Sequence, residues 1–289
     1  MRQRTRYIIR SAIKALKREG LACPSCGNAS NNQVIARKHL VTRLKRCDQC
    51  QLLFRTPTTR ASEDRSFYQN DYSHGSTTDC PTDEELSAYI DHSFENHENS
   101  YAPYVELLVA AGAKEGTRLF EFGCSWGYGS WQFAQAGFEV ESYEISTPRA
   151  EFAKKKLGVK THSSLADVQG PFDIFFSSHV LEHVPSVQET ITFGMNLLRP
   201  GGLFIALTPN GSQDRRAANP ESWEKSWGFV HPNLLDDQYY QHTFDKHAYM
   251  LTSPPYSVDA ISNWSKGNNP SAMEHPDRVG PELLLLVKK

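Results

Sequence analysis

The regular alternation of strand-like and helix-like segments between residues 117 and 210 is the feature that most restricts the fold of this chain. Short apolar runs such as TRLFEFGCS (117–125), EVESYEIS (139–146) and PFDIFFSSHV (171–180) alternate with segments of helical spacing such as TPRAEFAKKKLG (147–158). Strands that alternate with helices form a parallel sheet with helices on both faces. We therefore predict an α/β core over residues 100–210, with ELLLLV (282–287) as a buried final strand.

The glycine-rich stretch LFEFGCSWGYGS (119–130) follows the first strand of this core. In an open parallel sheet, ligands bind beyond the carboxyl ends of the strands. Gly123, Gly127 and the small Ser125 would leave the backbone bare enough for a nucleotide-like cofactor. Glu144 lies at the end of the second strand, where a carboxylate can accept hydrogen bonds from ribose hydroxyls.

The same stretch also contains G-x-S-x-G, the nucleophile elbow of serine hydrolases. An elbow usually follows several strands that build the sheet. Here the motif comes at the first strand of the alternating region, and no earlier segment could supply an oxyanion loop. The position therefore favours a cofactor loop over a nucleophilic Ser125.

Two C-x2-C pairs, Cys23/Cys26 and Cys47/Cys50, enclose the segment 27–46. Each pair can form a tight turn that directs two thiolates to one point, and two turns complete the tetrahedron that zinc prefers. We predict a zinc ribbon over residues 21–60, with a structural ion because all four ligands come from the protein. Two disulfides are the alternative, although nothing in the sequence indicates an oxidising compartment.

His179, Glu182 and His183 spell H-x-x-E-H, which is also a metalloprotease signature. The motif lies at a strand-to-helix junction, and Pro185 suits the start of the following helix. We predict instead that Glu182 and His183 border an acceptor site, meaning the site of the substrate that receives a group from the cofactor. His183 would be a general base there, because its ordinary pKa lies near neutrality. The alternative is that both residues only cap and orient the helix.

Residues 211–280 form a long segment rich in aromatic and titratable side chains. It is too long for a simple connection, and we predict an acceptor-binding lid over 211–289 that includes the closing strand. A small aromatic core is the alternative. The residues concerned are Trp223, Trp227, His231, Tyr239, Tyr240, His242 and Tyr256.

Within that segment, SPPY (253–256) resembles the loop with which amino-methyltransferases of DNA and RNA hold an exocyclic nitrogen. In those enzymes the loop follows the fourth strand, and here it follows the fifth. We therefore interpret it as an ordinary proline turn.

The charge of the chain is unevenly distributed. Residues 1–60 hold 14 lysines and arginines against only Glu19 and Asp48, a net charge of +12, and the remainder carries −14. Residues 1–20 read as a basic amphipathic helix. This basic region could hold RNA, an anionic membrane surface or a phosphorylated substrate, or it could dock on the acidic remainder of the chain. Because the chain has neither a long apolar span nor a secretory signal, we expect a soluble cytoplasmic protein.

The cofactor loop, Glu144, FDIFFSSHVLEHV and LLRPGGLFIALTPN together resemble the class I S-adenosylmethionine-dependent methyltransferase family over about residues 100–210. The resemblance implies a Rossmann-like parallel sheet with an antiparallel final strand. Ser125 departs from the middle glycine of the family's E/D-x-G-x-G-x-G loop and slightly restricts it. NAD is a rival for the loop, but the second glycine pair of its fingerprint is missing. The implied cofactor-binding residues are Glu121, Gly123, Ser125, Gly127, Glu144, Ser164, Leu165, Ser178 and His179.

The four-cysteine region, followed by CDQCQLLFRTP and, in the connecting segment 61–99, by FYQNDY, resembles a bacterial subgroup that includes sugar C-methyltransferases. The resemblance implies methyl transfer to a sugar, nucleotide-sugar or related metabolite, at carbon or oxygen. Some related quinone O-methyltransferases hold a divalent ion near the position of Glu182 and His183. We predict His183, His179 and His231, with Glu182, as the catalytic candidates.

Two other functions fit the same sequence. One is RNA methylation, with the zinc ribbon and the basic arm holding phosphates. The other is a non-catalytic cofactor-binding or interaction module. We favour the small molecule because the basic arm lacks interleaved aromatic residues that could stack on bases.

Overall fold

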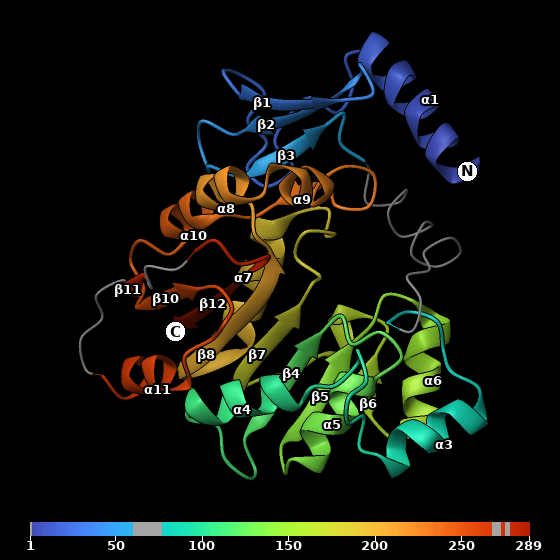
Figure 1. The fold of residues 1–289 in the computed structure, drawn as a ribbon, viewed down its shortest axis with the longest axis vertical. Coiled ribbons are helices and arrows are strands. Elements are labelled where there is room, and N and C mark those ends of the chain that lie inside the picture. The colour runs from blue at the N-terminus through green and yellow to red at the C-terminus, as the bar shows by residue number, and fades with distance from the viewer. Residues whose placement is uncertain (1, 60–76, 268–272, 275–277) are drawn as a thin grey trace.

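The computed structural model describes residues 2–59, 77–267, 273–274 and 278–289 (Figure 1). These residues form an eight-stranded sheet and a separate four-stranded sheet. The stretch FYQNDY (67–72), on which part of the resemblance depends, lies outside the described residues.

The large sheet has the order β11-β10-β12-β8-β7-β4-β5-β6. Strand β12 pairs antiparallel with both β8 and β10, and the other paired strands of this sheet run parallel. The prediction of a Rossmann-like parallel sheet with an antiparallel final strand is therefore confirmed. The strands are β4 (Arg118–Phe122), β5 (Glu139–Tyr143), β6 (Lys160–His162), β7 (Phe172–Ser178), β8 (Leu198–Pro209), β10 (Tyr249–Thr252), β11 (Met273–Glu274) and β12 (Glu282–Lys288).

Alternate residues of the central strands serve two different cores, because successive side chains of a strand point to opposite faces. Phe120 and Phe175 belong to the core that α7 (Val187–Leu197) and α10 (Asp237–Thr243) complete. Leu119 and Ile174 belong to the core on the other face, which includes residues of α4 (Ala102–Ala110), α5 (Tyr128–Gln135) and α11 (Val258–Lys266). The carboxyl ends of the parallel strands are thereby held in a fixed arrangement.

The remaining helices lie at the edges of this core. They are α3 (Asp83–Asp91), α6 (Thr147–Leu157), the 3-10 helix η1 (Leu165–Asp167), α8 (Gln213–Ala218) and α9 (Pro220–Lys225). None of the helices in the part of the chain that the structure describes has the length and apolar character needed to cross a bilayer.

The N-terminal region begins with α1 (Arg2–Leu16) and continues with β1 (Gln33–Lys38), β2 (Thr42–Arg46) and β3 (Leu53–Thr56). Strand β2 pairs antiparallel with both β1 and β3. The sheet has a fourth strand, β9 (Asn233–Leu234), in which Leu234 lies opposite Leu53. The N-terminal sheet is therefore completed by a segment that follows β8 in the chain.

Basic residues fasten the N-terminal sheet to the body of the protein. Arg46 forms a buried ion pair with Asp236 at 2.5 Å. Arg55 donates hydrogen bonds to the backbone carbonyls of Gly228 and Phe229, at 2.8 and 3.0 Å. Part of the excess positive charge of residues 1–60 is thus used inside the molecule.

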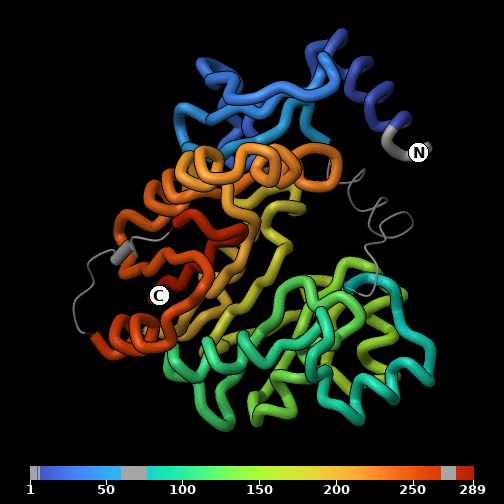
Figure 2. The backbone as a smooth tube through the Cα atoms, in the orientation of Figure 1, coloured from blue at the N-terminus to red at the C-terminus, as the bar shows by residue number. Residues whose placement is uncertain are grey.

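The segment that we predicted as a lid, 211–280, divides between several structures. It supplies β9 to the N-terminal sheet and β10 to the large sheet, and Tyr239 and Tyr240 are fully buried in the core. The part that carries α8 and α9 runs between the two sheets (Figure 2), where Arg216 donates to the carbonyl of Ile35.

Candidate active site

One cavity of about 1760 Å³ extends from the carboxyl ends of β4 and β5 to the N-terminal sheet. Gly123, Ser125 and Glu144 line one end, which we call the cofactor end. Tyr7, Lys38 and Trp227 are among the residues at the other end, which we call the acceptor end, and the residues that follow β7 lie between them.

The cofactor end is shaped by the turn between β4 and α5. Gly123, Ser125 and Gly127 have φ angles of +86°, +51° and +93°. A Cβ atom on Gly123 would overlap a methyl group of Val180, and one on Gly127 would come within 2.6 Å of the Cβ of Ala153. Glycine is therefore required at both positions, and the turn places Gly123 and Ser125 on the cavity while Gly127 packs against α6.

Glu144 fixes this turn from the neighbouring strand. Its carboxylate accepts hydrogen bonds from the backbone N–H groups of Ser125 at 3.0 Å and Ser146 at 2.8 Å. The Nη1 atom of Arg149 lies 3.9 Å from the Oε1 atom of Glu144. Burial raises the pKa of Glu144, and these contacts oppose that effect. Because the side chain also lines the cavity, its remaining lone pairs are available to a ligand.

Ser125 does not have the surroundings of a nucleophile. Its hydroxyl donates a hydrogen bond to the backbone carbonyl of Thr77 at 2.5 Å. A serine nucleophile needs a base such as an imidazole as its hydrogen-bond partner. The contact with Thr77 therefore supports the cofactor-loop interpretation over the hydrolase elbow.

Glu121 lies beneath the turn, outside the cavity lining. Its carboxylate accepts a hydrogen bond from the hydroxyl of Ser130 and is fully buried, with Tyr101 beside it. Burial raises the pKa of Glu121 to about 7. It supports the loop from below, whereas Leu165 and Ser178 lie on the cavity and Ser164 caps η1.

Sequence reasoning missed one wall of the cofactor end. Thr77 and Thr78, from the connecting segment, line the cavity beside the turn. Arg149 holds this segment through a hydrogen bond from its Nε to the carbonyl of Thr78 at 2.8 Å. Nothing in the polar sequence around residues 77–79 indicates this role, because the contacts are made by backbone atoms.

His179 follows β7 directly, with a φ angle of +54°. Its Nε2 lies 2.7 Å from a carboxylate oxygen of Glu282, and its Nδ1 lies 3.6 Å from Glu182. Burial alone would lower the pKa of His179, but the two carboxylates raise it to about 10. The imidazole is therefore protonated at neutral pH, which makes it a fixed positive charge on the cavity wall.

Glu182, His183 and His231 form a second cluster, with their ligand atoms within 4.8 Å of one another. Glu182 is completely buried, yet neither of its carboxylate oxygens has a hydrogen-bond donor among the described residues. The Nε2 atom of His183 lies 3.7 Å from the Oε1 atom of Glu182. A buried carboxylate without donors is costly, so this arrangement is suited to a cation or to a ligand that enters the cavity.

The tautomers of both histidines follow from their backbone contacts. The Nδ1 atom of His183 contacts the carbonyl of Val230 at 3.1 Å, and that of His231 contacts the carbonyl of Ser226 at 3.0 Å. A carbonyl only accepts, so Nδ1–H must be the donor in each ring, and in a neutral ring Nε2 then carries the lone pair. This pattern is typical of imidazoles that bind a metal ion or accept a proton.

The charges of this cluster are unequal. Burial lowers the pKa of His183 to about 4, so its ring is neutral near pH 7. Burial opposes ionisation of Glu182, but His179 and the other two imidazoles lower its pKa to about 2.

The H-x-x-E-H residues lie in a turn before α7 and do not share a helix face, unlike the metalloprotease motif.

The acceptor end joins the N-terminal region to the segment before β9. Lys38 donates hydrogen bonds to the carbonyls of Glu224 and Trp227, and its ammonium lies 4.2 Å from the ring centre of Trp227. Trp223 donates from Nε1 to the carbonyl of Gly211 at 3.0 Å. Of the residues named for the predicted lid, Trp223, Trp227 and His231 line the cavity. Tyr256 donates a hydrogen bond to Glu282 at 2.6 Å.

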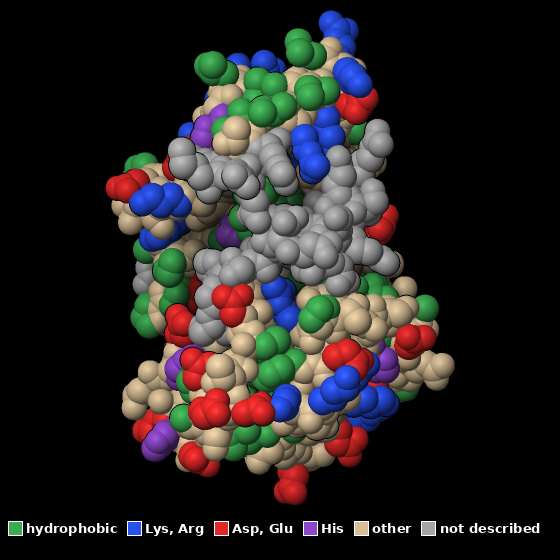
Figure 3. Space-filling view, turned by 90° about the vertical axis from the view of Figure 1, so that its right-hand side faces the viewer, with side chains coloured by type: hydrophobic (Ala, Val, Ile, Leu, Met, Phe, Trp, Pro, Cys, Tyr) green, Lys and Arg blue, Asp and Glu red, His purple; other side chains and the backbone are tan. Residues whose placement is uncertain are grey.

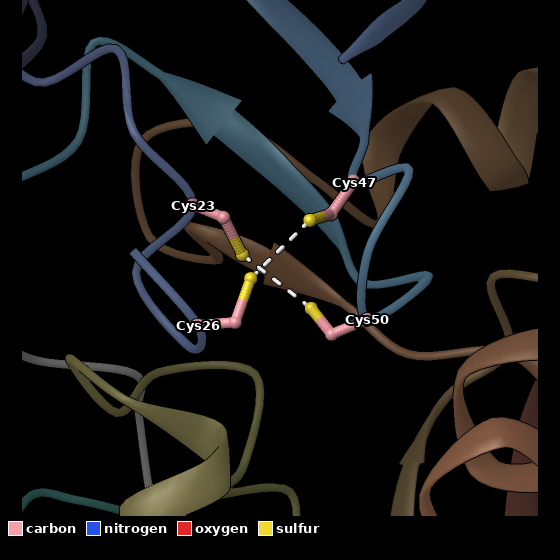
Figure 4. A group of neighbouring side chains, drawn as sticks. All are labelled: Cys23, Cys26, Cys47 and Cys50. Carbon is pink, nitrogen blue, oxygen red and sulfur yellow. Dashed lines mark hydrogen bonds between the residues drawn. The ribbon is translucent and has the colours of Figure 1, made fainter. Parts of the chain in front are cut away.

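The four cysteines gather at one point of the N-terminal region (Figure 4). The sulfur atoms of Cys23 and Cys50 lie 3.6 Å apart, and those of Cys26 and Cys47 lie 3.4 Å apart. A tetrahedral zinc ion with bonds of about 2.3 Å would place its sulfur ligands roughly 3.8 Å apart. The cluster therefore fits a four-cysteine zinc site, and these distances do not correspond to disulfide bonds.

A family model described as a methyltransferase domain matches residues 93–252. Among curated proteins, the chain is 28% identical to a ubiquinone biosynthesis O-methyltransferase of Caulobacter sp. (strain K31), over 54% of this chain and 65% of that protein. It is 27% identical to the protein of the same description from Caulobacter vibrioides, over 54% of this chain and 69% of that protein. The matched region thus spans about two thirds of these relatives.

Solved structures with a similar chain path include the plantazolicin methyltransferase BpumL in complex with SAH. The similarity has a TM-score of 0.49 and 11% sequence identity, and it covers 78% of this chain and 94% of that one.

Proposed function

Because this chain belongs to the methyltransferase-domain family, we propose that it transfers a methyl group from S-adenosylmethionine to a small molecule bound at the acceptor end of the cavity. The family assignment agrees with the methyltransferase that the sequence predicts. The observation that carries the proposal is the continuity of the cavity. A single space joins the Gly123–Glu144 region to the cluster of Glu182, His183 and His231 and then to Trp223 and Trp227.

The residues at the cofactor end fit the group that the family implies. The turn presents bare backbone at Gly123, and the carboxylate of Glu144 lies on the same wall. We propose that Gly123, Ser125, Glu144 and Leu165 contact S-adenosylmethionine directly. Glu121 and Gly127 would hold the shape of the turn. When bound, S-adenosylmethionine supplies an electrophilic methyl group for a single displacement.

The residues after β7 would act on the acceptor. His183 is neutral near pH 7 and keeps a lone pair on Nε2, so it can take a proton from a hydroxyl or an acidic C–H group. His179 is protonated and held by Glu282, which suits a positioning role over that of a base. Trp223 and Trp227 would orient the acceptor and exclude water.

The same cluster could instead hold a divalent cation. Glu182, His183 and His231 offer one carboxylate and two imidazoles, a donor set that suits first-row divalent metals. Metal analysis of protein purified without chelator separates the two roles. A divalent ion in addition to that of the cysteines, with turnover lost in EDTA and restored by the metal, would assign the cluster as a metal centre.

We propose that the four cysteines hold a structural zinc ion. All four ligands come from the protein, so the site is closed to substrate, and the four sulfur atoms lie within 4.8 Å of one another. The ion would stabilise the strands from which Lys38 and Thr42 project into the cavity. Its contribution to the reaction is therefore indirect, through the wall of the acceptor end.

The acceptor classes to test first come from the two resemblances. Sugars and nucleotide-sugars follow from the resemblance to sugar C-methyltransferases, and intermediates of ubiquinone biosynthesis follow from the description of the relatives. Purified protein is incubated with methyl-labelled S-adenosylmethionine and each class, and transfer of label is measured. Nuclear magnetic resonance of the product then shows whether carbon or oxygen carries the methyl group.

Two outcomes would replace this proposal. Methylation of RNA, with binding that falls steeply as salt rises, would favour the alternative in which the basic N-terminal region holds phosphates. Tight binding of S-adenosylmethionine without turnover on any of these acceptors would favour a non-catalytic module. Isothermal titration with the cofactor is therefore the first measurement.

A further inference from the structure

Helix α1 carries apolar side chains on the side that faces solvent as well as on the side that packs against the protein. Its inner face packs on the protein through Tyr7 and Ser11, which are both buried. The ring of Tyr7 lies 4.8 Å from that of Phe229. On the other side Ile9, Ile13 and Leu16 are 55%, 48% and 85% exposed. Their helical spacing places them in one stripe, which we call the outer face of α1.

The outer face belongs to a larger concentration of exposed apolar residues. Eight large hydrophobic side chains are exposed among the described residues. Five of them, Ile9, Ile13, Leu16, Val34 and Leu40, come from α1 and the first hairpin of the N-terminal sheet. Single exposed apolar residues are ordinary, but a stripe of three along one helix indicates a contact surface.

The charges beside the outer face are almost all positive. Arg10, Lys17 and Arg18 are exposed on or directly after α1. Glu19 is the only acidic residue among residues 1–47. Figure 3 shows lysine and arginine side chains gathered with hydrophobic ones at the end of the molecule where α1 and the N-terminal sheet lie.

We propose that the outer face of α1 docks on an anionic lipid bilayer surface, with the helix lying in the plane of the headgroups. An interfacial helix of this kind buries an apolar stripe at the boundary with the acyl chains and places its basic residues among anionic headgroups. Each lysine or arginine near such a surface adds electrostatic attraction. An anionic bilayer would therefore cover the apolar stripe and also pair with the basic residues. Docking of α1 on the bilayer does not depend on the proposed reaction.

Other partners satisfy only one of these features. RNA would pair with the basic residues but would leave Ile9, Ile13 and Leu16 in water. A second copy of the chain could cover the stripe, but it would bring the exposed Arg10, Lys17 and Arg18 of one copy close to the same residues of the other. The bilayer is the partner that the combination of the two features favours.

The experiment measures sedimentation of the full-length protein with vesicles. One set contains phosphatidylcholine alone and the other contains phosphatidylcholine with phosphatidylglycerol. The wild-type protein should bind the anionic vesicles, more weakly as salt rises, and should bind the neutral vesicles at least about tenfold more weakly. A triple variant with Ile9→Ser, Ile13→Ser and Leu16→Ser should lose at least about tenfold in the partition coefficient.

A matched control removes three exposed valines elsewhere, with Val109→Ser, Val258→Ser and Val279→Ser. This control should bind vesicles like the wild type. Circular dichroism and cofactor titration establish that each variant is folded. Should the serine triple variant fail to fold, a double variant with Arg10→Glu and Lys17→Glu provides the second test, and it should also lose binding to anionic vesicles.

Several results would overturn the proposal. Absence of binding to both kinds of vesicle would do so, as would equal binding by the serine triple variant. A dimer in analytical ultracentrifugation that dissociates in the triple variant would assign the outer face to a second copy. Retention of RNA that depends on Arg10 and Lys17, without vesicle binding, would assign the basic residues to nucleic acid.

Discussion

The two ends of the cavity are built in different ways. The cofactor end is made largely by consecutive strand–turn units between β4 and η1, so that Gly123, Glu144 and Leu165 come from one continuous stretch of the chain. The acceptor end combines Tyr7 and Lys38 of the N-terminal region with Trp223 and Trp227, which come from a segment far along the sequence. Short-range geometry therefore determines the first end, whereas the second depends on how distant segments dock.

The largest expected effect comes from the cysteines, and it tests whether the two ends are separable. Cys47→Ser should abolish ion binding and unfold the N-terminal sheet, because closed zinc sites contribute on the order of 10 kcal/mol to folding. Turnover should be lost, whereas the affinity for S-adenosylmethionine, measured by isothermal titration, should change by less than about threefold.

Cys80→Ser is the matched control for this variant, because Cys80 lies outside the four-cysteine cluster. Zinc content is measured by mass spectrometry. Full turnover by Cys47→Ser would show that the N-terminal sheet is not needed at the acceptor end.

Glu182→Gln is expected to have the next largest effect, on the reaction alone. The change removes the buried negative charge between the imidazoles but keeps the shape of the side chain. Turnover should fall by about a thousandfold, whether the cluster moves a proton or holds a cation. Cofactor affinity should stay within about threefold.

Glu189→Gln is its control, since Glu189 lies on the same cavity but is exposed. A Glu182→Gln variant with near-normal turnover would remove this cluster from the reaction.

The residues of the cofactor end are more visible in the sequence than those of the acceptor end, for a physical reason. A turn that needs positive φ angles and lacks room for a Cβ atom restricts its residues to glycine, so Gly123 and Gly127 are visible in the sequence. The contacts of Thr77 and Thr78 use backbone carbonyls, which any residue possesses. Likewise, no local pattern in the sequence shows that Lys38 donates a hydrogen bond to the carbonyl of Trp227, or that β9 completes the N-terminal sheet.

Glu121 allows a pH test of the cofactor end. Burial raises the pKa of Glu121 to about 7 from an ordinary value of 4.5. As the pH rises, Glu121 ionises at a lower pH in the unfolded chain than in the folded protein. The free energy of unfolding therefore falls as the pH rises from about 4.5 to 7. Glu121→Gln should remove that loss, which amounts to about 3 kcal/mol at pH 8.

Urea unfolding of the ligand-free protein at pH 5 and pH 8 measures this effect. Glu139→Gln, on the neighbouring strand and exposed, is the control. If Glu121→Gln were no more stable than the wild type at pH 8, the buried carboxyl would not titrate in this way.

The smallest effect is expected for Glu144→Ala, which changes direct contacts to the cofactor. The variant loses a carboxylate on the cavity and the hydrogen bonds to Ser125 and Ser146. The Kd for S-adenosylmethionine should rise by about 10- to 30-fold, as for the loss of a hydrogen bond to a charged group. Glu139→Ala should leave the Kd unchanged, and equal affinities of both variants would show that Glu144 makes no contact with the cofactor.

The pairing of β3 with β9 has a consequence for synthesis on the ribosome. Leu53 leaves the exit tunnel long before Leu234, so the edge of the N-terminal sheet has no partner strand while most of the large sheet is being translated. Both leucines are completely buried in the finished protein. A nascent chain that pauses before Leu234 would therefore keep an apolar edge uncovered, and a chaperone would have reason to stay bound until that strand emerges.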